Sequence, residues 1–168
     1  MSKRKGVQLG RTSYYGWMIH EPEHLAKVLR RAVDEFRMHV LYMPDAIAYI
    51  GSSGSAIAFL LAERYALPII YVRKKGEKSH GRKVEVNTGR PIADYMIVDD
   101  FVRTGETVRS IKTRVERHAR SEMGHAKGPK CLGVYCWTGI EKDSYLNAQF
   151  IGRGRYREQV KLYGPINS

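Results

Sequence analysis

Cysteine, long apolar runs and acidic side chains are all scarce in this chain of 168 residues. Its two cysteines, Cys131 and Cys136, lie in one apolar run, which favours buried thiols over a disulfide or a metal pair. In a regular strand their spacing of five residues places them on opposite faces. The longest uncharged stretch, Ala46 to Ala62, is interrupted by glycine and serine and excludes a spanning helix. Met1 to Gly6 is basic but precedes no apolar segment, so we expect no secretory signal and a cytoplasmic protein.

The shortage of acidic residues leaves the chain strongly positive. It has 29 lysines and arginines against 17 aspartates and glutamates, a formal net charge of +12. Such a field attracts nucleic acid, an anionic membrane surface or small phosphorylated ligands, and charge alone does not choose among them. Hydrophobic residues make up 43% of the chain, which is enough for a core and excludes wholesale disorder. The length predicts a single domain.

Short apolar runs and amphipathic segments alternate along the chain. Helical spacing of apolar residues predicts helices over Glu23 to Arg37, Ser55 to Tyr65 and Thr107 to Ala119. Apolar runs predict buried strands over Ala46 to Ile50, Pro68 to Val72, Tyr95 to Val98 and Leu132 to Trp137. This alternation predicts an α/β fold, a parallel twisted sheet flanked by helices. Ligands of such sheets bind at the loops that follow the carboxyl ends of the strands.

The most informative segment is Tyr95 to Val108, which reads Tyr-Met-Ile-Val-Asp-Asp-Phe-Val-Arg-Thr-Gly-Glu-Thr-Val. A strand brings the carboxylates of Asp99 and Asp100 to its end, and a turn with Gly105 then opens a helix. Backbone N–H groups, threonine hydroxyls and the helix dipole at that turn favour a phosphate. The two carboxylates suit ribose hydroxyls or a divalent metal such as Mg²⁺. The segment therefore fits a sugar phosphate; the alternative is an ordinary strand followed by a capped helix.

This segment resembles the signature of the type I phosphoribosyltransferases, in which an acidic pair is followed by two apolar residues and Thr-Thr-Gly-Gly-Thr. The chain departs from that pattern at Arg103 and Glu106. The resemblance implies the family's fold, with a core over about residues 21–137 and a small hood formed by residues 1–20 and 138–168. It also implies a Mg²⁺-dependent enzyme that moves the phosphoribosyl group of phosphoribosyl pyrophosphate to a nucleobase and releases pyrophosphate.

The resemblance also implies roles for individual residues. Asp99 and Asp100 would hold the ribose hydroxyls and the metal, with Asp100 counted as catalytic. The 5-phosphate would be held by Arg103, Thr104, Gly105, Glu106 and Thr107. The Gly51 to Ser55 turn stands where the family has its pyrophosphate loop and would contribute Ser52, Ser53 and Gly54. The alternative for this turn is a plain helix start capped by Ser53 or Ser55.

Arg73 to Arg90 holds seven basic and two acidic residues and is predicted to be a mobile loop. The part reading Lys74-Lys75-Gly76-Glu77-Lys78-Ser79-His80-Gly81 resembles the catalytic loop of orotate phosphoribosyltransferases, and adenine enzymes have a related pattern. The resemblance implies that Lys74 binds phosphoribosyl pyrophosphate and that Lys75, Lys78 and His80 are catalytic, closing over the departing pyrophosphate. A solvated charged loop is the alternative. Because such loops often reach a neighbouring active site in the family, the resemblance also implies a homodimer.

The base site is the least determined part of the prediction. Leu9 to Tyr15 partly resembles the hood segment of orotate enzymes, but Gln8 stands where those enzymes have a lysine. Phe101 and Trp137 are the candidates for contact with the base, Trp137 by stacking, and core packing is the alternative for both. An orotate-like pyrimidine enzyme is favoured, and a purine phosphoribosyltransferase is the alternative.

A third hypothesis keeps the fold but drops catalysis. Basic residues recur along the last predicted helix and just beyond it, at Arg109, Lys112, Arg114, Arg117 and Arg120. Together with the net charge they fit a regulator that senses phosphoribosyl pyrophosphate and binds RNA or DNA. Helical charge of this kind is usually a solvated face, so nucleic acid is a partner that the sequence does not favour, and no membrane partner is expected.

Overall fold

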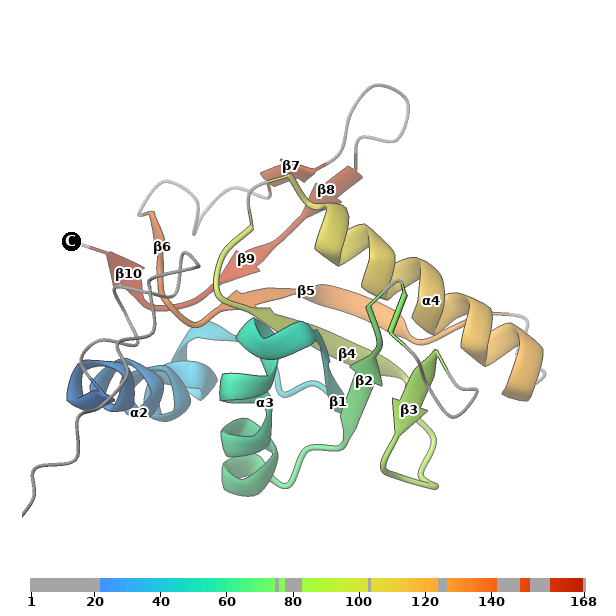
Figure 1. Cartoon of the computed structure of the whole chain (residues 1–168), viewed down its shortest axis with the longest axis horizontal. Coiled ribbons are helices and arrows are strands. Elements are labelled where there is room, and N and C mark those ends of the chain that lie inside the picture. Colours follow the sequence, from blue (N-terminus) through green and yellow to red (C-terminus); the bar gives the residue numbers. More distant parts are fainter. Residues whose placement is uncertain are drawn as a thin grey trace, which may run out of the picture.

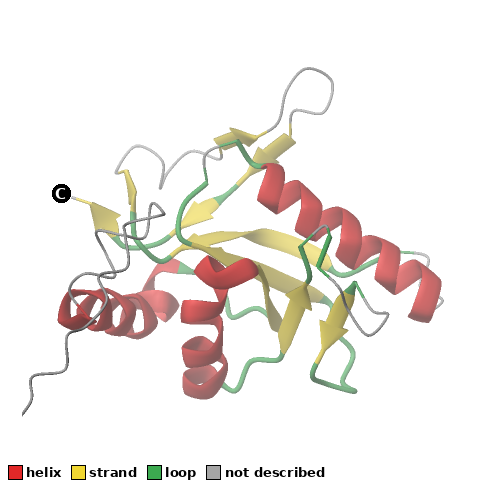
Figure 2. Cartoon of the chain, viewed as in Figure 1, coloured by secondary structure: helices red, strands yellow, loops and turns green. Residues whose placement is uncertain are grey.

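The computed structural model describes residues 22–74, 76–77, 83–102, 104–123, 127–141, 149–151 and 158–167. A central twisted sheet separates helices α2 (Pro22–His39) and α3 (Gly51–Tyr65) from helix α4 (Glu106–Met123), as Figure 1 shows. The same view coloured by secondary structure makes the layers plain (Figure 2). The predicted parallel sheet flanked by helices is therefore confirmed.

The main sheet has six strands in the order β3-β2-β1-β4-β5-β9. The strands of that sheet are β1 (Ala46–Ile50), β2 (Ile69–Val72), β3 (Val84–Val86), β4 (Asp94–Asp99), β5 (Lys130–Cys136) and β9 (Leu162–Tyr163). All neighbours pair in parallel except β3, which runs antiparallel to β2. Two small ribbons pair β6 (Ile140–Glu141) with β10 (Ile166–Asn167), and β7 (Gln149–Ile151) with β8 (Glu158–Val160).

Each face of the sheet carries its own half of the core. On the first face α2 and α3 pack through Phe36, Ile57 and Leu61, all fully buried. On the second face α4 packs through Val108, Ile111 and Val115. These side chains lie three or four residues apart along each helix, which is the spacing that makes one apolar stripe. Burial of such stripes is the main favourable contribution to folding.

Two local features differ from the sequence prediction. Helix α3 begins at Gly51, four residues before the predicted start, because Gly51 has a φ of +69° and turns the chain directly out of β1. The segment predicted as a loop over residues 73–90 contains β3, whose Val84 is only 2% exposed. It pairs with β2 to form a hairpin, so only the middle of the segment remains a candidate loop.

The prediction that Cys131 and Cys136 lie on opposite faces is wrong. Tyr95 of β4 pairs with Cys131, but the next residue, Met96, pairs with Gly133, so β5 carries a bulge of one extra residue. The bulge reverses the alternation, and both cysteines pack on the α4 face. Gly133 has a φ of +151°, and a Cβ there would lie 2.5 Å from the Lys161 carbonyl oxygen and 2.7 Å from the Tyr163 ring. These two constraints explain why a glycine stands at this position. The two cysteines, both in the described part of the chain, form no disulfide.

The chain ends contribute to the core as well as to the predicted hood. Residues 1–20 lie outside the described residues. Strand β9, from the segment predicted as hood, joins the main sheet beside β5, and its Leu162 and Tyr163 are buried. Among the described helices, none is long and apolar enough to cross a membrane.

Candidate active site

Eight of the predicted site residues meet at the edge of the sheet where its parallel strands end. The acidic pair terminates β4, the first turn of α3 follows β1, and Lys74 follows β2. Together they surround a cavity of about 390 Å³, which we call the carboxyl-edge cavity. Its walls are Ile50, Ser53, Lys74, Asp99, Asp100, Phe101, Val102, Thr104, Gly105, Thr107 and Val108. The carboxyl ends of neighbouring parallel strands are where ligands of such sheets bind.

The acidic pair is held in place within a buried environment. Asp99 is 6% exposed and Asp100 is 7% exposed. One oxygen, Oδ1 of Asp99, accepts hydrogen bonds from the Ser53 hydroxyl at 2.9 Å and from the Asp100 backbone N–H at 3.0 Å. Burial, followed by contact with the Asp100 carboxyl, raises the pKa of Asp99 to about 7, while the bond from Ser53 acts in the opposite direction. A cation or a hydroxyl donor in the cavity would lower this pKa again, because it would stabilise the charged carboxylate.

Ser53 also ties the acidic pair to the end of β5. Its backbone carbonyl accepts a hydrogen bond of 3.1 Å from the indole Nε1 of Trp137. The Trp137 backbone N–H in turn donates to the Asp99 carbonyl, and the Thr138 hydroxyl donates to the Asp100 carbonyl at 2.6 Å. Three segments that are distant in the sequence therefore fix the position of the two carboxylates.

The base-stacking role predicted for Trp137 is not supported by its position. Its side chain is 1% exposed and packs in the core beneath α3, with the indole nitrogen already bonded. Burial on this scale leaves no open ring face for a base to stack against, so Trp137 is a packing residue. Phe101, the other candidate, is 40% exposed and lines the carboxyl-edge cavity, so its predicted contact with a base stays open.

The first turn of α3 offers backbone donors rather than side-chain caps. The residue before the helix, Ile50, is extended and gives no side-chain cap. The predicted caps lie inside the helix instead: Ser53 bonds to Asp99, and the Ser55 hydroxyl donates to the Ser52 carbonyl at 2.8 Å. The first N–H groups of a helix have no intrahelical acceptor, so this turn favours an anion.

Lys74 places a positive charge over the same turn. A Cβ built on Gly51 would lie 2.8 Å from the Lys74 ammonium nitrogen and 2.4 Å from its Cε. Glycine at position 51 therefore makes room for the lysine as well as adopting the positive φ. The combination of a helix N-terminus and an ammonium group is suited to a multiply charged anion such as pyrophosphate.

The N-terminus of α4 forms another wall of the cavity. Gly105 is buried with a φ of +73°, and its carbonyl accepts the Arg109 N–H at 2.9 Å. The Thr104 hydroxyl accepts a hydrogen bond from the Glu106 N–H at 3.4 Å. Thr104, Gly105 and Thr107 line the cavity, whereas the exposed Glu106 is not among its walls. This geometry fits the predicted phosphate turn.

The other predicted residues fall into two groups. Ser52 is exposed and does not line the cavity, and Gly54 is buried where a Cβ would lie 2.6 Å from Tyr49 Cβ and 2.7 Å from the Val98 carbonyl. Gly54 therefore serves the close packing of α3 on the sheet. The predicted residues that lie outside the described part of the chain are Lys75, Lys78, His80 and Arg103.

Hydrogen bonds hold the two ends of the charged segment that follows β2. The Arg73 N–H donates to the Lys83 carbonyl at 3.1 Å, which closes the β2–β3 hairpin. The Arg73 guanidinium bonds to the Glu85 carboxylate, and the Arg114 guanidinium of α4 bonds to the Arg73 carbonyl. The ends of this segment are thus fixed beside the cavity.

Sequence reasoning missed several walls of the cavity. Ile50, Val102 and Val108 supply its apolar surface, and Thr138 supports the Asp100 backbone. Ile50 directly precedes one predicted site segment and Val108 directly follows another, so their positions in the sequence could have indicated that they line the cavity. No comparable signal in the sequence points to Thr138, because its contact spans 38 positions.

Comparison with known proteins adds evidence of two kinds. No family model matches the chain. Over 62 residues it is 40% identical to the orotate phosphoribosyltransferase of Allorhizobium ampelinum, a match that covers 36% of this chain and 26% of that protein. The enzyme of the same name from Rhizobium johnstonii is 37% identical over a match of equal length. The matched part thus spans about a quarter of the length of these curated relatives.

The solved structures agree over much more of the chain. Orotate phosphoribosyltransferase from Aeropyrum pernix superposes with a TM-score of 0.56 at 17% identity, covering 93% of this chain and 77% of that one. Adenine phosphoribosyltransferase from Leishmania tarentolae gives 0.52 at 16% identity, covering 96% and 79%. The predicted resemblance is therefore confirmed: the chain has the fold of the type I phosphoribosyltransferases, with a short stretch of sequence similar to the orotate enzymes.

Proposed function

We propose that this chain is a Mg²⁺-dependent phosphoribosyltransferase that transfers the phosphoribosyl group of phosphoribosyl pyrophosphate to a nucleobase and releases pyrophosphate. An orotate-like pyrimidine is the favoured base. One observation carries the proposal: Asp99, Asp100, Thr104, Gly105 and Thr107 of the motif line one cavity together with Ser53 and Lys74. The sequence matches to orotate enzymes support the choice of base class.

The cavity offers a separate place for each part of the substrate. The buried carboxylates of Asp99 and Asp100 accept hydrogen bonds, which suits the ribose hydroxyls. The N-terminus of α4 with Thr104 and Thr107 suits the 5-phosphate. The first turn of α3 with Lys74 suits the pyrophosphate. The exposed ring of Phe101 leaves an apolar wall for the flat base.

The acidic pair also fits Mg²⁺ in the manner usual for phosphate substrates. Among the described residues no group of three or more His, Cys, Asp or Glu side chains is gathered as a metal cage. Mg²⁺ often binds through one or two carboxylates, with waters and substrate oxygens completing the shell. Asp99 and Asp100 would hold such an ion, whose charge would be shared with the substrate's phosphate oxygens.

The chemistry that these residues support is stabilisation of charge on the leaving group. When the bond from ribose C1 to pyrophosphate breaks, negative charge grows on the departing oxygens. Lys74 and the free N–H groups of α3 face that charge, and a single well-placed donor of this kind supplies about 3 kcal/mol. Lys75, Lys78, His80 and Arg103 are proposed to add to it. The acidic pair meanwhile fixes the ribose so that the base nitrogen attacks C1 in line.

Release of pyrophosphate is the experiment that tests the proposal. The purified chain is incubated with phosphoribosyl pyrophosphate, Mg²⁺ and, one at a time, orotate, uracil, adenine, guanine, hypoxanthine and xanthine. We expect turnover with one base, a pyrimidine, and none without Mg²⁺. Turnover with a purine alone would replace the orotate-like assignment by the purine alternative. Tight binding of phosphoribosyl pyrophosphate without turnover on any base would contradict the proposed enzymatic activity. It would favour the hypothesis of a regulator that senses this compound.

We also propose that the active form is a homodimer, as the loop resemblance implies. Light scattering coupled to gel filtration should then give a mass of twice the monomer. A monomeric mass for a preparation that turns over would contradict the dimer while leaving the reaction intact.

A further inference from the structure

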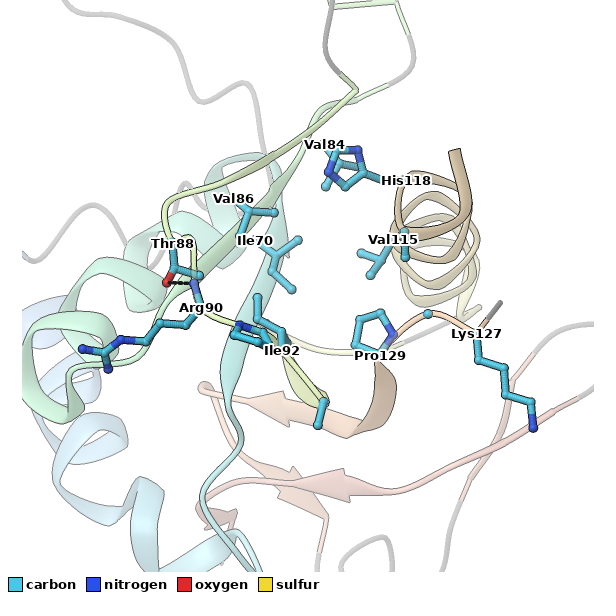
Figure 3. A pocket seen from close by; sticks show the side chains of 14 residues that line it. Ile70, Val84, Val86, Thr88, Arg90, Ile92, Val115, His118, Lys127 and Pro129 are labelled. Carbon is cyan, nitrogen blue, oxygen red and sulfur yellow. Dashed lines mark hydrogen bonds between the residues drawn. The ribbon is translucent and has the colours of Figure 1, made fainter. Parts of the chain in front are cut away.

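A second, larger cavity lies at the opposite edge of the sheet, where the parallel strands begin. It measures about 530 Å³, within the usual range for small-molecule sites. We call it the amino-edge cavity; Figure 3 shows it between the β2–β3 hairpin and the second half of α4. It shares no lining residue with the carboxyl-edge cavity. Nothing in the proposed reaction uses it.

The interior of the amino-edge cavity is apolar. Ile70 of β2 and Val84 of β3 lie on one side, and Val115 of α4 lies opposite (Figure 3). Ala119, one turn further along α4, also lines the cavity. Ile92, just before β4, lies on the floor between the two sides. These side chains present branched or methyl surfaces without a hydrogen-bonding group. These walls suit a ligand with an apolar body, because they offer such a body van der Waals contact and leave its polar groups to the rest of the lining.

The charged side chains of the lining are both cationic. They are Arg90 and Lys127, and the lining has no aspartate or glutamate. Figure 3 shows Arg90 and Lys127 extending outward from opposite sides of the cavity. The backbone of Arg90 is fixed, because its N–H donates to the Thr88 hydroxyl at 3.1 Å. Two cationic side chains therefore flank the mouth of the cavity.

Three acidic groups close to this edge have partners elsewhere. Glu116, which packs against Gly128, lies 4.0 Å from the Arg120 guanidinium. Asp45 accepts a hydrogen bond from the Ala93 N–H at 2.8 Å, and Asp94 accepts one from the Asp45 N–H at 3.0 Å. Their carboxylates join the start of β4 to the turn before β1 and are not among the cavity's walls. The charge presented by the lining residues is therefore complementary to an anion.

We propose that the amino-edge cavity is a binding site for a small amphipathic anion, a compound with a compact apolar body and one carboxylate, phosphate or sulfonate group. The body fills the space between α4 and the β2–β3 hairpin. The anionic group stays at the mouth, where Arg90 and Lys127 supply positive charge from opposite sides. Neither part of this arrangement depends on the proposed phosphoribosyl transfer, because the two cavities share no residue.

Titration calorimetry with matched amphiphiles tests the proposal on the full chain. Decanoate and decylammonium have the same apolar length and opposite charge, so their difference isolates the cations at the mouth. We expect decanoate, below its micellar concentration, to bind at one site at least tenfold more tightly than decylammonium. Equal affinities, or no saturable binding of decanoate, would overturn the proposal.

Two variants locate the site. Ala119→Leu fills the cavity from α4 and should weaken decanoate binding at least tenfold. Because that change touches the core, Arg90→Glu with Lys127→Glu is the second variant. Both residues are exposed, where substitutions usually change stability little. It should abolish the preference for decanoate. The matched control is Arg30→Glu with Arg64→Glu in the α2–α3 groove on the other face, which should leave binding unchanged. Equal losses in the control and the mouth variant would show nonspecific attraction and overturn the site.

Discussion

The two cavities lie at opposite edges of one sheet and differ in nearly every property. The carboxyl-edge cavity is smaller and holds buried carboxylates, hydroxyls and the N-termini of α3 and α4. The amino-edge cavity is larger, is walled mainly by aliphatic side chains, and has Arg90 and Lys127 but no carboxylate in its lining. Strand direction explains much of this difference. In a parallel sheet every following helix begins at the carboxyl edge, so its unpaired N–H groups gather there and favour anions deep inside the site.

The largest expected effect separates the two cavities by function. Replacing both carboxylates, Asp99→Asn with Asp100→Asn, removes the acceptors for ribose and metal at the carboxyl edge. We expect pyrophosphate release to fall by at least about 10³-fold. Decanoate affinity at the amino edge should stay within twofold of the unchanged chain. The exposed Asp34→Asn on α2 is the control for loss of a carboxylate. Full activity in the double variant would show that Asp99 and Asp100 are not needed for the reaction.

The two cysteines allow the two edges to be compared along a single strand, because Cys131 is the second residue of β5 and Cys136 is its last. Burial, with a smaller contribution from Asp99 and Asp100, raises the pKa of Cys136 to about 12. Cys131 is half-buried. Since only the thiolate reacts, iodoacetamide at pH 8 should label Cys131 about 100-fold faster than Cys136, as followed by mass spectrometry. In urea the two rates should converge; equal rates in the folded chain would contradict this burial of Cys136.

Two glycines test how tightly each edge is built. In Gly54→Ala the new Cβ meets Tyr49 and the Val98 carbonyl at under 3 Å, so α3 must move away from the sheet beside the acidic pair. We expect the free energy of unfolding in urea to fall by about 1–3 kcal/mol. Gly89→Ala, near the amino edge, meets nothing within 4 Å and should change it by less than about 0.5 kcal/mol. A neutral Gly54→Ala would show that this packing is loose.

The last comparison is a slope in stability with pH, which we expect from the acidic pair at the carboxyl edge. The pKa of Asp99 is raised from 3.8 to about 7, so the folded chain binds this proton more tightly than the unfolded chain does. The contribution of Asp99 to the free energy of unfolding must therefore fall as pH rises from about 4 to 7, and level off above. Urea unfolding in metal-free buffer at several pH values, for the unchanged chain and Asp99→Asn, should give a difference with this slope. Parallel curves would refute it.

The carboxyl edge could be predicted from the sequence because its signals are local. The strand over Ala46–Ile50 was predicted with its observed bounds, since charge and glycine delimit it on either side. The acidic pair and the phosphate turn occupy one continuous segment, so their chemistry could be recognised before the fold was known. The sequence did not show how deeply each side chain is buried. Nothing in the residues around Trp137 distinguishes a tryptophan that lines a site from one that packs in the core behind it.

The amino edge could not be predicted, because its signals are spread over the chain. Its walls come from β2, β3, the turn before β4, α4 and the turn before β5. Strand β3 itself was missed, as three residues inside a highly charged segment give too short an alternation to detect. The bulge at Gly133 is similarly invisible, because the clash that requires glycine is with β9, some 30 positions further on.

The hydrogen bond from Arg73 to Lys83 sets a limit on the charged segment that it closes. No residue of that segment is more than five positions from a fixed end, a reach of about 17 Å for fully extended chain. Charges tethered within such a radius act at an effective concentration on the order of tens of millimolar. The length of the segment, as much as its lysines, therefore determines how much positive charge the cavity experiences. Inserting glycines would dilute that charge without removing a single cation.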